Sequence, residues 1–405
     1  FLRAYFYFEL IKRYRNIPFV LDVLAQNEAN GVNPESYEKI AKFIVDECSD
    51  LAQILPVNYD NFSTKEKGRV TRAAAMALKS RVTLYMASPL FSEDSEDKWK
   101  QAAEAAYDII KQKTDLGLDL VPYPQIFNDV NNQKAEVILY RPTGESGDFE
   151  KANFPIGVEG GKTSTCPTQN LMEAYDMKDG TPFVWNNQSN PYDNRDPRMK
   201  YTIVCNEMKW PVDPVEIWEG GTNGLPLQNA TTTGYYLKKY VNNTISFEAG
   251  STVTKKQHNW VLFRYGEILL NYAEAMINAF HDPNYKDAVY NMSAREAVNQ
   301  IRGRTNISLP GFPSDITEKD FVKRLKNERR VELAFEGHRF WDVRRWKELG
   351  QTANIYGVKI TKNNEVISYE KFLLETRAVT DNMYFYPIPN TERFKNPNLG
   401  QNPGW

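Results

Sequence analysis

The sequence predicts a mainly α-helical protein in which a helical scaffold is interrupted by a loop-rich subdomain with short strands. Two observations carry this prediction. Proline, glycine, asparagine and threonine break the chain into short pieces between 116 and 259, where no long periodic helix is expected. Elsewhere, apolar residues recur at three- and four-residue intervals, as in amphipathic helices, over 34–55, 68–88, 98–113, 261–280, 293–304 and 317–336.

The first expected element is an aromatic-rich helix at 1–14, FLRAYFYFELIKRY, which begins without methionine. We expect that further residues precede it in the full protein. An export signal or a lipid attachment site could lie there, so the given residues do not exclude either one.

Two helical pairs follow from the spacing, one at 68–113 and one at 261–304. In each pair a long helix with a tyrosine, Tyr85 or Tyr272, precedes a shorter helix with spaced alanines. This arrangement weakly resembles tetratricopeptide helix pairs, which bury a shared core by stacking. Ordinary helix packing would give similar alanine spacing, so the residues alone leave both interpretations open.

Short strands are expected at 136–141 and 235–241, and again beyond 354. The chain ends in an extended tail, FYPIPNTERFKNPNLGQNPGW, which cannot bond to itself and must lie against the rest of the protein. We therefore expect one domain: a helical scaffold at 1–115 and 261–349, a loop-rich ligand-binding region at 116–260, and C-terminal strands with the tail at 350–405.

The stretch 328–350, ERRVELAFEGHRFWDVRRWKELG, concentrates carboxylates and arginines around two tryptophans. A helix is expected to start at Thr317, which can cap it, and to end at Gly337. Glu328 and Glu332 then continue its apolar stripe, so they need cationic partners. The sequence predicts a structural ion network in which these partners are the arginines just past the glycine, Arg339, Arg344 and Arg345. A catalytic carboxylate pair would also need a pocket and a positioned water or nucleophile.

Composition argues against several function classes. The 50 lysines and arginines are balanced by 52 aspartates and glutamates, which leaves no basic excess for nucleic-acid binding. No run of eighteen apolar residues could span a membrane. Cys48, Cys166 and Cys205 are far apart and suggest neither a disulfide framework nor a zinc site.

Enzyme and cofactor motifs are weak. GVEGGKT at 157–163 has one residue too few between its glycines for a phosphate-binding loop. No GxSxG motif is present, and His258, His281 and His338 lie outside any HExxH or triad pattern. NDVNN at 128–132 offers oxygen ligands but lacks the acidic density of a calcium loop. We expect a protein without catalytic residues, bound metal or cofactor.

The loop-rich region has the residues that sugar binding needs. Sugar rings stack on indole and phenol faces, and their hydroxyls bond to amides and carboxylates. The alternative is that these aromatic residues fill gaps against the helices. The candidate ligand-binding residues are Trp185, Trp210, Trp218, Tyr192, Tyr235 and Tyr236, accompanied by the amides of Asn186, Asn187, Gln188 and Asn190.

Several long motifs carry a family resemblance: GRVTRAAAMALKSRVTLYMASPLF, FRYGEILLNYAEAMINA, ERRVELAFEGHRFWDVRRW, YDNRDPRM, and the closing YPIP with QNPGW. Together they resemble the SusD/RagB family, and the resemblance runs along the chain from 1 to 405. The resemblance implies a scaffold of tetratricopeptide-like helices that includes the 328–346 stretch. It also implies a lipid-anchored surface protein of Bacteroidetes-type bacteria that binds nutrients, usually glycans, beside a SusC-like TonB-dependent outer-membrane transporter.

The motifs do not identify the ligand, and the segment that would carry the lipid anchor is not among these residues. Two other functions therefore stay open. One is a glycoside-processing enzyme that uses an unrecognised carboxylate pair. The other is a structural lid of a transporter for peptides or other nutrients.

Overall fold

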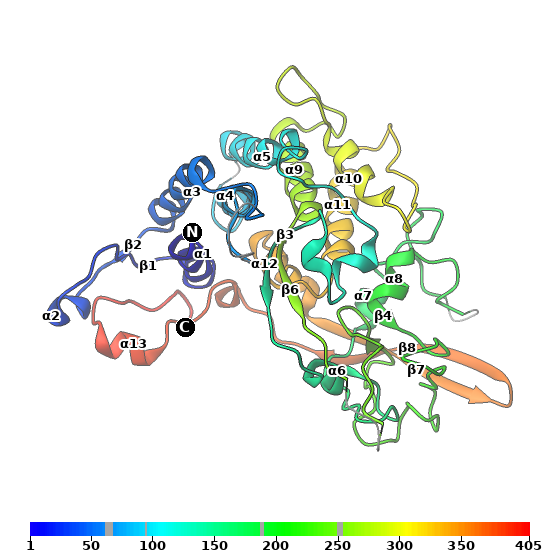
Figure 1. Ribbon diagram of the computed structural model, residues 1–405. Coiled ribbons are helices and arrows are strands. Elements are labelled where there is room, and N and C mark those ends of the chain that lie inside the picture. The colour runs from blue at the N-terminus through cyan, green and yellow to red at the C-terminus, as the bar shows by residue number, and fades with distance from the viewer. Residues whose placement is uncertain (61–67, 94, 187–189, 249–253) are drawn as a thin grey trace.

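The computed structural model describes residues 1–60, 68–93, 95–186, 190–248 and 254–405, and it is mainly helical, as predicted (Figure 1). The long helices lie within two residues of the predicted segments at most of their ends, because apolar periodicity and capping residues agree there. They are α1 (Leu2–Tyr14), α3 (Tyr37–Ile54), α4 (Arg72–Ala87), α5 (Glu96–Lys111), α9 (Tyr265–Phe280), α10 (Ala294–Arg302) and α11 (Glu318–Glu332).

Helix α9 is the centre of the scaffold. It packs against α5, α10, α11 and α4, and α4 in turn packs against α3 and α5, so both predicted helical pairs are present. Almost every residue of α9 is buried. Alanines without solvent exposure, such as Ala77, Ala106 and Ala273, allow these helices to approach closely and share one apolar core.

The predicted helix at 261–280 is wrong at its start. Residues Asn259–Arg264 form strand β6, and α9 begins only at Tyr265. Strand β6 pairs antiparallel with β3 (Val137–Pro142), which confirms the predicted strand at 136–141. The consecutive apolar side chains of Val261, Leu262 and Phe263 fit either a buried strand or a buried helix, and pairing with β3 decides for the strand.

The loop-rich region contains only short elements. These are η1 (Tyr123–Ile126), η2 (Asn131–Gln133), α6 (Asp148–Asn153), α7 (Gln169–Met172), α8 (Pro197–Thr202), and the paired strands β4 (Ile203–Val204) and β5 (Tyr236–Leu237). The predicted strand at 235–241 is therefore too long, because the chain turns after Leu237 and the backbone N–H of Val241 donates to the Lys238 carbonyl oxygen. Buried residues of this region form a second core, which includes Phe154, Met172, Tyr175, Val204 and Ile217.

Strands β7 (Asn354–Asn363) and β8 (Val366–Thr376) form a hairpin that extends away from the helices (Figure 1). Asn364 in its turn has a φ of 55°, which asparagine tolerates better than most residues. Val358, Ile360 and Tyr369 of the hairpin belong to the second core. The hairpin therefore joins the C-terminal segment to the loop-rich region.

The tail lies against the N-terminal helices, as predicted. The Asn402 side-chain amide donates to the carbonyl oxygens of Tyr14 at 3.3 Å and of Tyr386 at 2.7 Å. The Asn396 amide donates to the Val32 carbonyl oxygen at 2.7 Å. The remaining elements are α2 (Gln26–Ala29), β1 (Ile17–Pro18), β2 (Pro34–Glu35), α12 (Arg339–Arg345), η3 (Leu349–Thr352), η4 (Asp381–Tyr384) and α13 (Asn390–Lys395).

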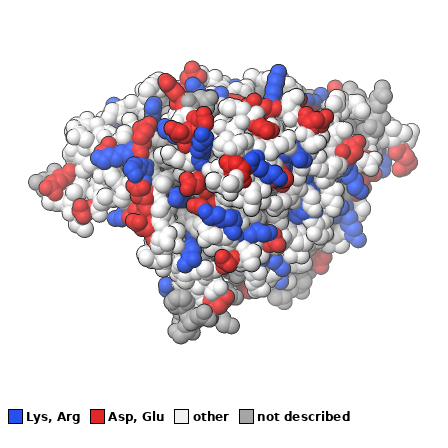
Figure 2. Space-filling model, turned by 90° about the horizontal axis from the view of Figure 1, so that it is seen from above, with Lys and Arg blue, Asp and Glu red and all other residues white. Residues whose placement is uncertain are grey.

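Charged side chains of both signs are interspersed over the face shown in Figure 2, without a large field of one sign. None of the helices in the described parts of the chain combines the length and apolar character needed to cross a bilayer.

Candidate ligand-binding site

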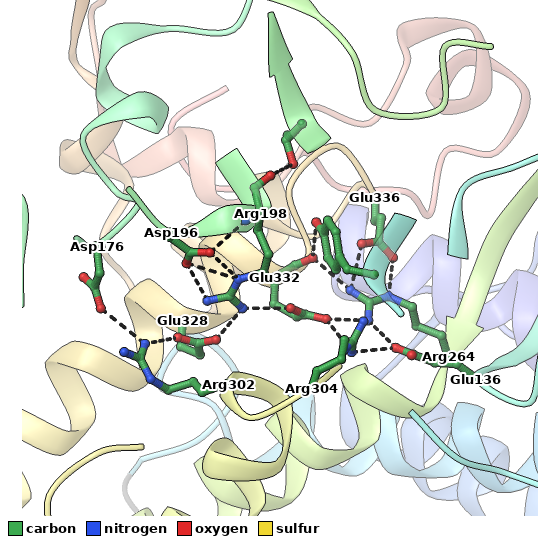
Figure 3. A network of polar contacts seen from close by, with 12 residues as sticks. Glu136, Asp176, Asp196, Arg198, Arg264, Arg302, Arg304, Glu328, Glu332 and Glu336 are labelled. Atoms are coloured by element: carbon green, nitrogen blue, oxygen red, sulfur yellow. Dashed lines mark hydrogen bonds and ion pairs between the residues drawn. The ribbon is translucent and has the colours of Figure 1, made fainter. Parts of the chain in front are cut away.

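Glu328 and Glu332 lie at the centre of a buried ion network (Figure 3). Their side chains are 3% and 0% exposed. Glu332 accepts hydrogen bonds from Arg198 at 2.8 Å, Arg264 at 2.8 Å and Arg304 at 2.9 Å. Glu328 bonds to Arg198, and its other oxygen accepts from Arg302 at 2.8 Å. The remaining acids of the network are Glu136, Asp176, Asp196 and Glu336.

The predicted partners of these two glutamates are wrong. Arg339 donates to Gln351 at 2.9 Å, and Arg344 lies over the ring of Phe340. Arg345 joins a separate buried cluster, in which it pairs with Glu274 of α9 and with Asp342. The cause is that α11 ends at Glu332 rather than at Gly337, so the chain turns earlier and α12 carries these arginines away from the network.

The network has the electrostatics of a structural element. Burial alone would raise the pKa of Glu332, but Arg304, Arg264 and Arg198 hold that pKa well below the ordinary value. The pKa of Glu328 is also lowered, because the charges of Arg198 and Arg302 outweigh its burial. A general acid needs a raised pKa and access to substrate. Both glutamates are instead held ionised and out of reach of solvent.

The aromatic candidates do not form one surface. Tyr235 and Tyr236 are wholly buried in the second core, and their hydroxyl groups donate to Gln169 and to the Asn223 carbonyl oxygen. They have no exposed face for a ligand, so their assignment as ligand-contacting residues is corrected: both rings are packed among the residues of the second core. Tyr192 is partly buried, and its ring lies 6.1 Å from that of Tyr235.

Trp185 and Trp218 are partly exposed at the edge of the second core. Trp185 makes an edge contact with Phe183 at a centroid distance of 6.4 Å, and Lys362 of the hairpin lies 4.6 Å from the Trp218 ring centroid. Asn186 and Asn190 are exposed, whereas Asn187 and Gln188 lie outside the described residues. Whether Trp185, Trp218 or Tyr192 contacts a ligand stays a prediction.

Trp210 lines a pocket of about 420 Å³. The indole is only 7% exposed, and its Nε1–H has no hydrogen-bond partner among the described residues. Lys238 lies 4.8 Å from the ring centroid. Other aromatic side chains in the wall come from Phe127, Tyr201 and Tyr240. The nitrogen itself is buried, so a ligand in the pocket would contact the indole ring and not this N–H.

Polar groups surround the same pocket. Asp129 and Lys256 lie 3.4 Å apart as an ion pair at its edge, and the amides of Asn128, Asn242 and Asn243 are in its lining. His258 stacks on Trp260 at 5.0 Å, and its Nε2 lies 3.0 Å from Glu150. The arrangement combines ring faces with amide and carboxylate oxygens, which is what sugar recognition requires.

Sequence reasoning missed most of this pocket wall. Tyr201, Tyr240 and Phe127 come from three separate segments, and only the fold brings them beside Trp210. The available signal was NDVNN at 128–132, whose first two residues line the pocket. No group of three or more His, Cys, Asp or Glu side chains suited to a metal ion occurs in the parts of the chain that the structure describes.

The glycines of GVEGGKT have a packing role. Gly157 has a φ of +87°, and a Cβ atom there would collide with the Thr222 carbonyl oxygen. A Cβ atom at Gly161 would collide with the Pro155 carbonyl oxygen. These contacts account for the glycines without a phosphate ligand.

The SusD family model matches residues 126–405, more than half of the chain. The chain belongs to the SusD family. This confirms the resemblance given by the motifs at 192–199, 263–279 and 328–346, and by the closing YPIP and QNPGW. The expectation that the chain is not an enzyme agrees with its membership of this family.

Solved structures are similar along the whole chain. A SusD-like protein from Bacteroides fragilis has a TM-score of 0.82 and 27% identity, and the match covers 100% of this chain and 78% of that one. A SusD-like carbohydrate-binding protein from the same species has a TM-score of 0.80 and 26% identity over 98% and 78% of the two chains. The protein therefore has the mainly helical SusD-like fold with short two-stranded sheets.

A curated relative, SusD-like protein P2 of Formosa agariphila, is 29% identical over 163 residues. The match covers 39% of this chain and 28% of that relative, so the chain matches less than a third of the relative's length.

Proposed function

We propose that this SusD-family chain is a non-catalytic carbohydrate-binding protein of the outer cell surface, lipid-anchored, which passes its ligand to a SusC-like TonB-dependent transporter. The observation that carries the proposal is the family match over residues 126–405. The whole-chain similarity to a structure described as a carbohydrate-binding protein supports it.

The pocket beside Trp210 is the proposed glycan site. It joins the Trp210 indole, further aromatic rings, and amide groups on loops that a rigid helical scaffold supports. Loops held by such a scaffold can vary without disturbing the core, which suits a family that must recognise different sugars.

A panel of oligosaccharides tests binding against catalysis. Calorimetry with the purified protein should show binding to at least one oligosaccharide, and chromatography of the same mixture after long incubation should show that oligosaccharide unchanged. Cleaved product would support the glycoside-processing enzyme instead. Binding of peptides with no binding of any saccharide would support a lid for a transporter of other nutrients.

The transporter partner requires a separate measurement. A protein that hands over a ligand needs a persistent interface, and obligate interfaces commonly bury about 2,000 Å² or more. We expect the full-length native protein, solubilised gently from membranes, to copurify with a TonB-dependent transporter. Recovery of the full-length protein alone, under conditions that keep other outer-membrane complexes intact, would contradict this part of the proposal.

A further inference from the structure

A second groove, separate from the Trp210 pocket, runs along α11. Its volume is about 800 Å³, and its walls come from α11, the start of α12, and the segments 173–183 and 313–320. Apolar side chains contribute to the lining, among them Phe183, Ile316 and Val322. Sites for small molecules commonly have volumes of roughly 300–1,000 Å³ and combine an apolar lining with a few polar groups. The groove fits that description.

Two arginines in this groove lack a carboxylate partner. Arg330 and Arg339 are both partly buried. Arg339 donates one hydrogen bond, to the neutral side chain of Gln351 at 2.9 Å. The Arg330 guanidinium has no hydrogen bond or ion pair to any residue that the structure describes. Their charges are close enough to repel each other, since Arg339 disfavours the charged form of Arg330.

The carboxylates nearest to these arginines along the walls are already engaged. Glu173 pairs with Lys371 at 2.8 Å. Asp176 pairs with Arg302 at 3.2 Å, and Glu348 bonds to Lys326. The other acids of the lining, Asp315 and Asp320, are exposed in the 313–320 segment. The wall carboxylates act on the two arginines only from a distance, Glu173 on Arg330 and Glu348 on Arg339, and neither arginine has a direct ion pair among the described residues.

Both arginines stay charged at neutral pH. Burial, helped by the charge of Arg339, lowers the pKa of Arg330 to about 10. Burial also lowers the pKa of Arg339, against the opposing effect of Asp342 and Glu348. An anion between the two guanidinium groups would remove their repulsion and supply the acceptors that they lack. Guanidinium groups bind the planar oxygen pair of a carboxylate, or a sulfate, through paired hydrogen bonds.

We propose that this groove binds an acidic saccharide, whose carboxylate or sulfate group lies between Arg330 and Arg339 while a sugar ring packs against Phe183. The inference rests on the proposed function, which it deepens by naming a ligand class and a second binding site. The Arg195 guanidinium covers one face of the Phe183 ring at 3.6 Å, so the sugar would pack against the opposite face. Trp185 contacts Phe183 and would support this site from outside the groove lining.

Titration calorimetry with three probes of equal length tests the proposal: an oligogalacturonate, a sulfated oligosaccharide and a neutral oligosaccharide. We expect the parent protein to bind at least one acidic probe, with affinity that falls as salt is raised. Arg330→Gln should weaken that binding roughly tenfold or more, as expected for a lost hydrogen bond between charged groups. Arg330→Lys keeps the positive charge but loses the paired N–H donors of the guanidinium. Its affinity for the acidic probe should lie between that of the parent and that of Arg330→Gln.

Arg377→Gln is the matched control, because Arg377 is exposed, lies outside the groove lining, and carries the same charge. Its acidic-probe affinity should change little. The affinity for the neutral probe, which binds at the Trp210 pocket, should be the same in all variants. Loss of acidic-probe binding alone therefore tests this inference, and loss of neutral-probe binding tests the proposed function. The inference is overturned if no acidic probe binds, or if folded Arg330→Gln binds as the parent does. It is also overturned if an acidic peptide alone occupies the groove.

Discussion

Glu332→Ala is expected to lower the free energy of unfolding by about 3–5 kcal/mol, the usual loss when one partner of a buried ion pair is removed. The reason is that the arginines left without this carboxylate are buried. Arg198, Arg264 and Arg304 have side chains that are 1% exposed, and each would lose a carboxylate oxygen within 2.9 Å. These guanidinium groups would stay buried with one charge partner fewer. Chemical denaturation followed by circular dichroism measures the loss.

The pH dependence of stability gives a second measure of the same residue. The folded-state pKa of Glu332 is lowered relative to the unfolded chain, where glutamate titrates at about 4.3. A lowered carboxyl pKa contributes stability above the unfolded value, and that stability is lost as the pH falls toward the folded value. The parent should therefore lose stability below about pH 4, and Glu332→Ala should lose it less steeply.

Glu365→Ala is the control for both measurements, since this glutamate is 95% exposed in the hairpin turn and 3.7 Å from Lys362. Its effect on the free energy of unfolding should stay within about 0.5 kcal/mol. Glycan affinity of the folded Glu332→Ala protein should match that of the parent. A Glu332→Ala protein with normal stability and no glycan binding would show that the network belongs to the binding site instead.

Local signals made the scaffold predictable from sequence. Thr317 caps α11 by accepting from the backbone N–H of Asp320, as its spacing predicts, and Thr71 caps α4 through the N–H of Ala74. Periodic apolar residues then fix which face of each helix is buried. Such signals act within a few residues, so they can be read without knowing the tertiary structure.

The partners within the ion network could not be predicted from such local signals. The sequence indicates correctly that Glu328 and Glu332 are buried and need cations, because they continue an apolar stripe. It does not indicate which cations, since Arg198 lies 134 residues from Glu332 along the chain and Arg264 lies 68 residues away. Sequence proximity favoured Arg345, but α12 turns this side chain toward Glu274 of α9. The motif at 192–199 contained Arg198 without showing its partner.

Burial decides among the aromatic candidates, and it too depends on tertiary structure. Tyr235 and Tyr236 are aromatic residues of the loop-rich region, as the tryptophans are, but tertiary packing places both inside the second core. The proposed pocket contains only Trp210 of the six candidates. Its other rings come from Phe127, Tyr201 and Tyr240, and their convergence has no local sequence signal.

Trp210→Ala is expected to weaken glycan binding by about 1–3 kcal/mol, which is roughly five- to over a hundredfold in affinity. The indole contributes an aromatic surface to the pocket wall, and alanine does not. Because Trp210 is also packed in the second core, the same change should lower the melting temperature. Calorimetry must therefore be done at a temperature where circular dichroism shows the variant folded.

Tyr201→Ala separates binding from packing, because Tyr201 lines the same pocket but is only partly buried. It should weaken glycan binding with a smaller loss of stability than Trp210→Ala. Trp218→Ala is the matched control: this tryptophan packs on the same second core, outside the pocket lining, so its loss should lower the melting temperature and leave affinity unchanged.

If the Trp185, Trp210 and Trp218 variants all bind the glycan as the parent does, the site is not in the loop-rich region. If Trp218→Ala alone loses binding, the ligand lies between that ring and the hairpin, where Lys362 now covers the indole.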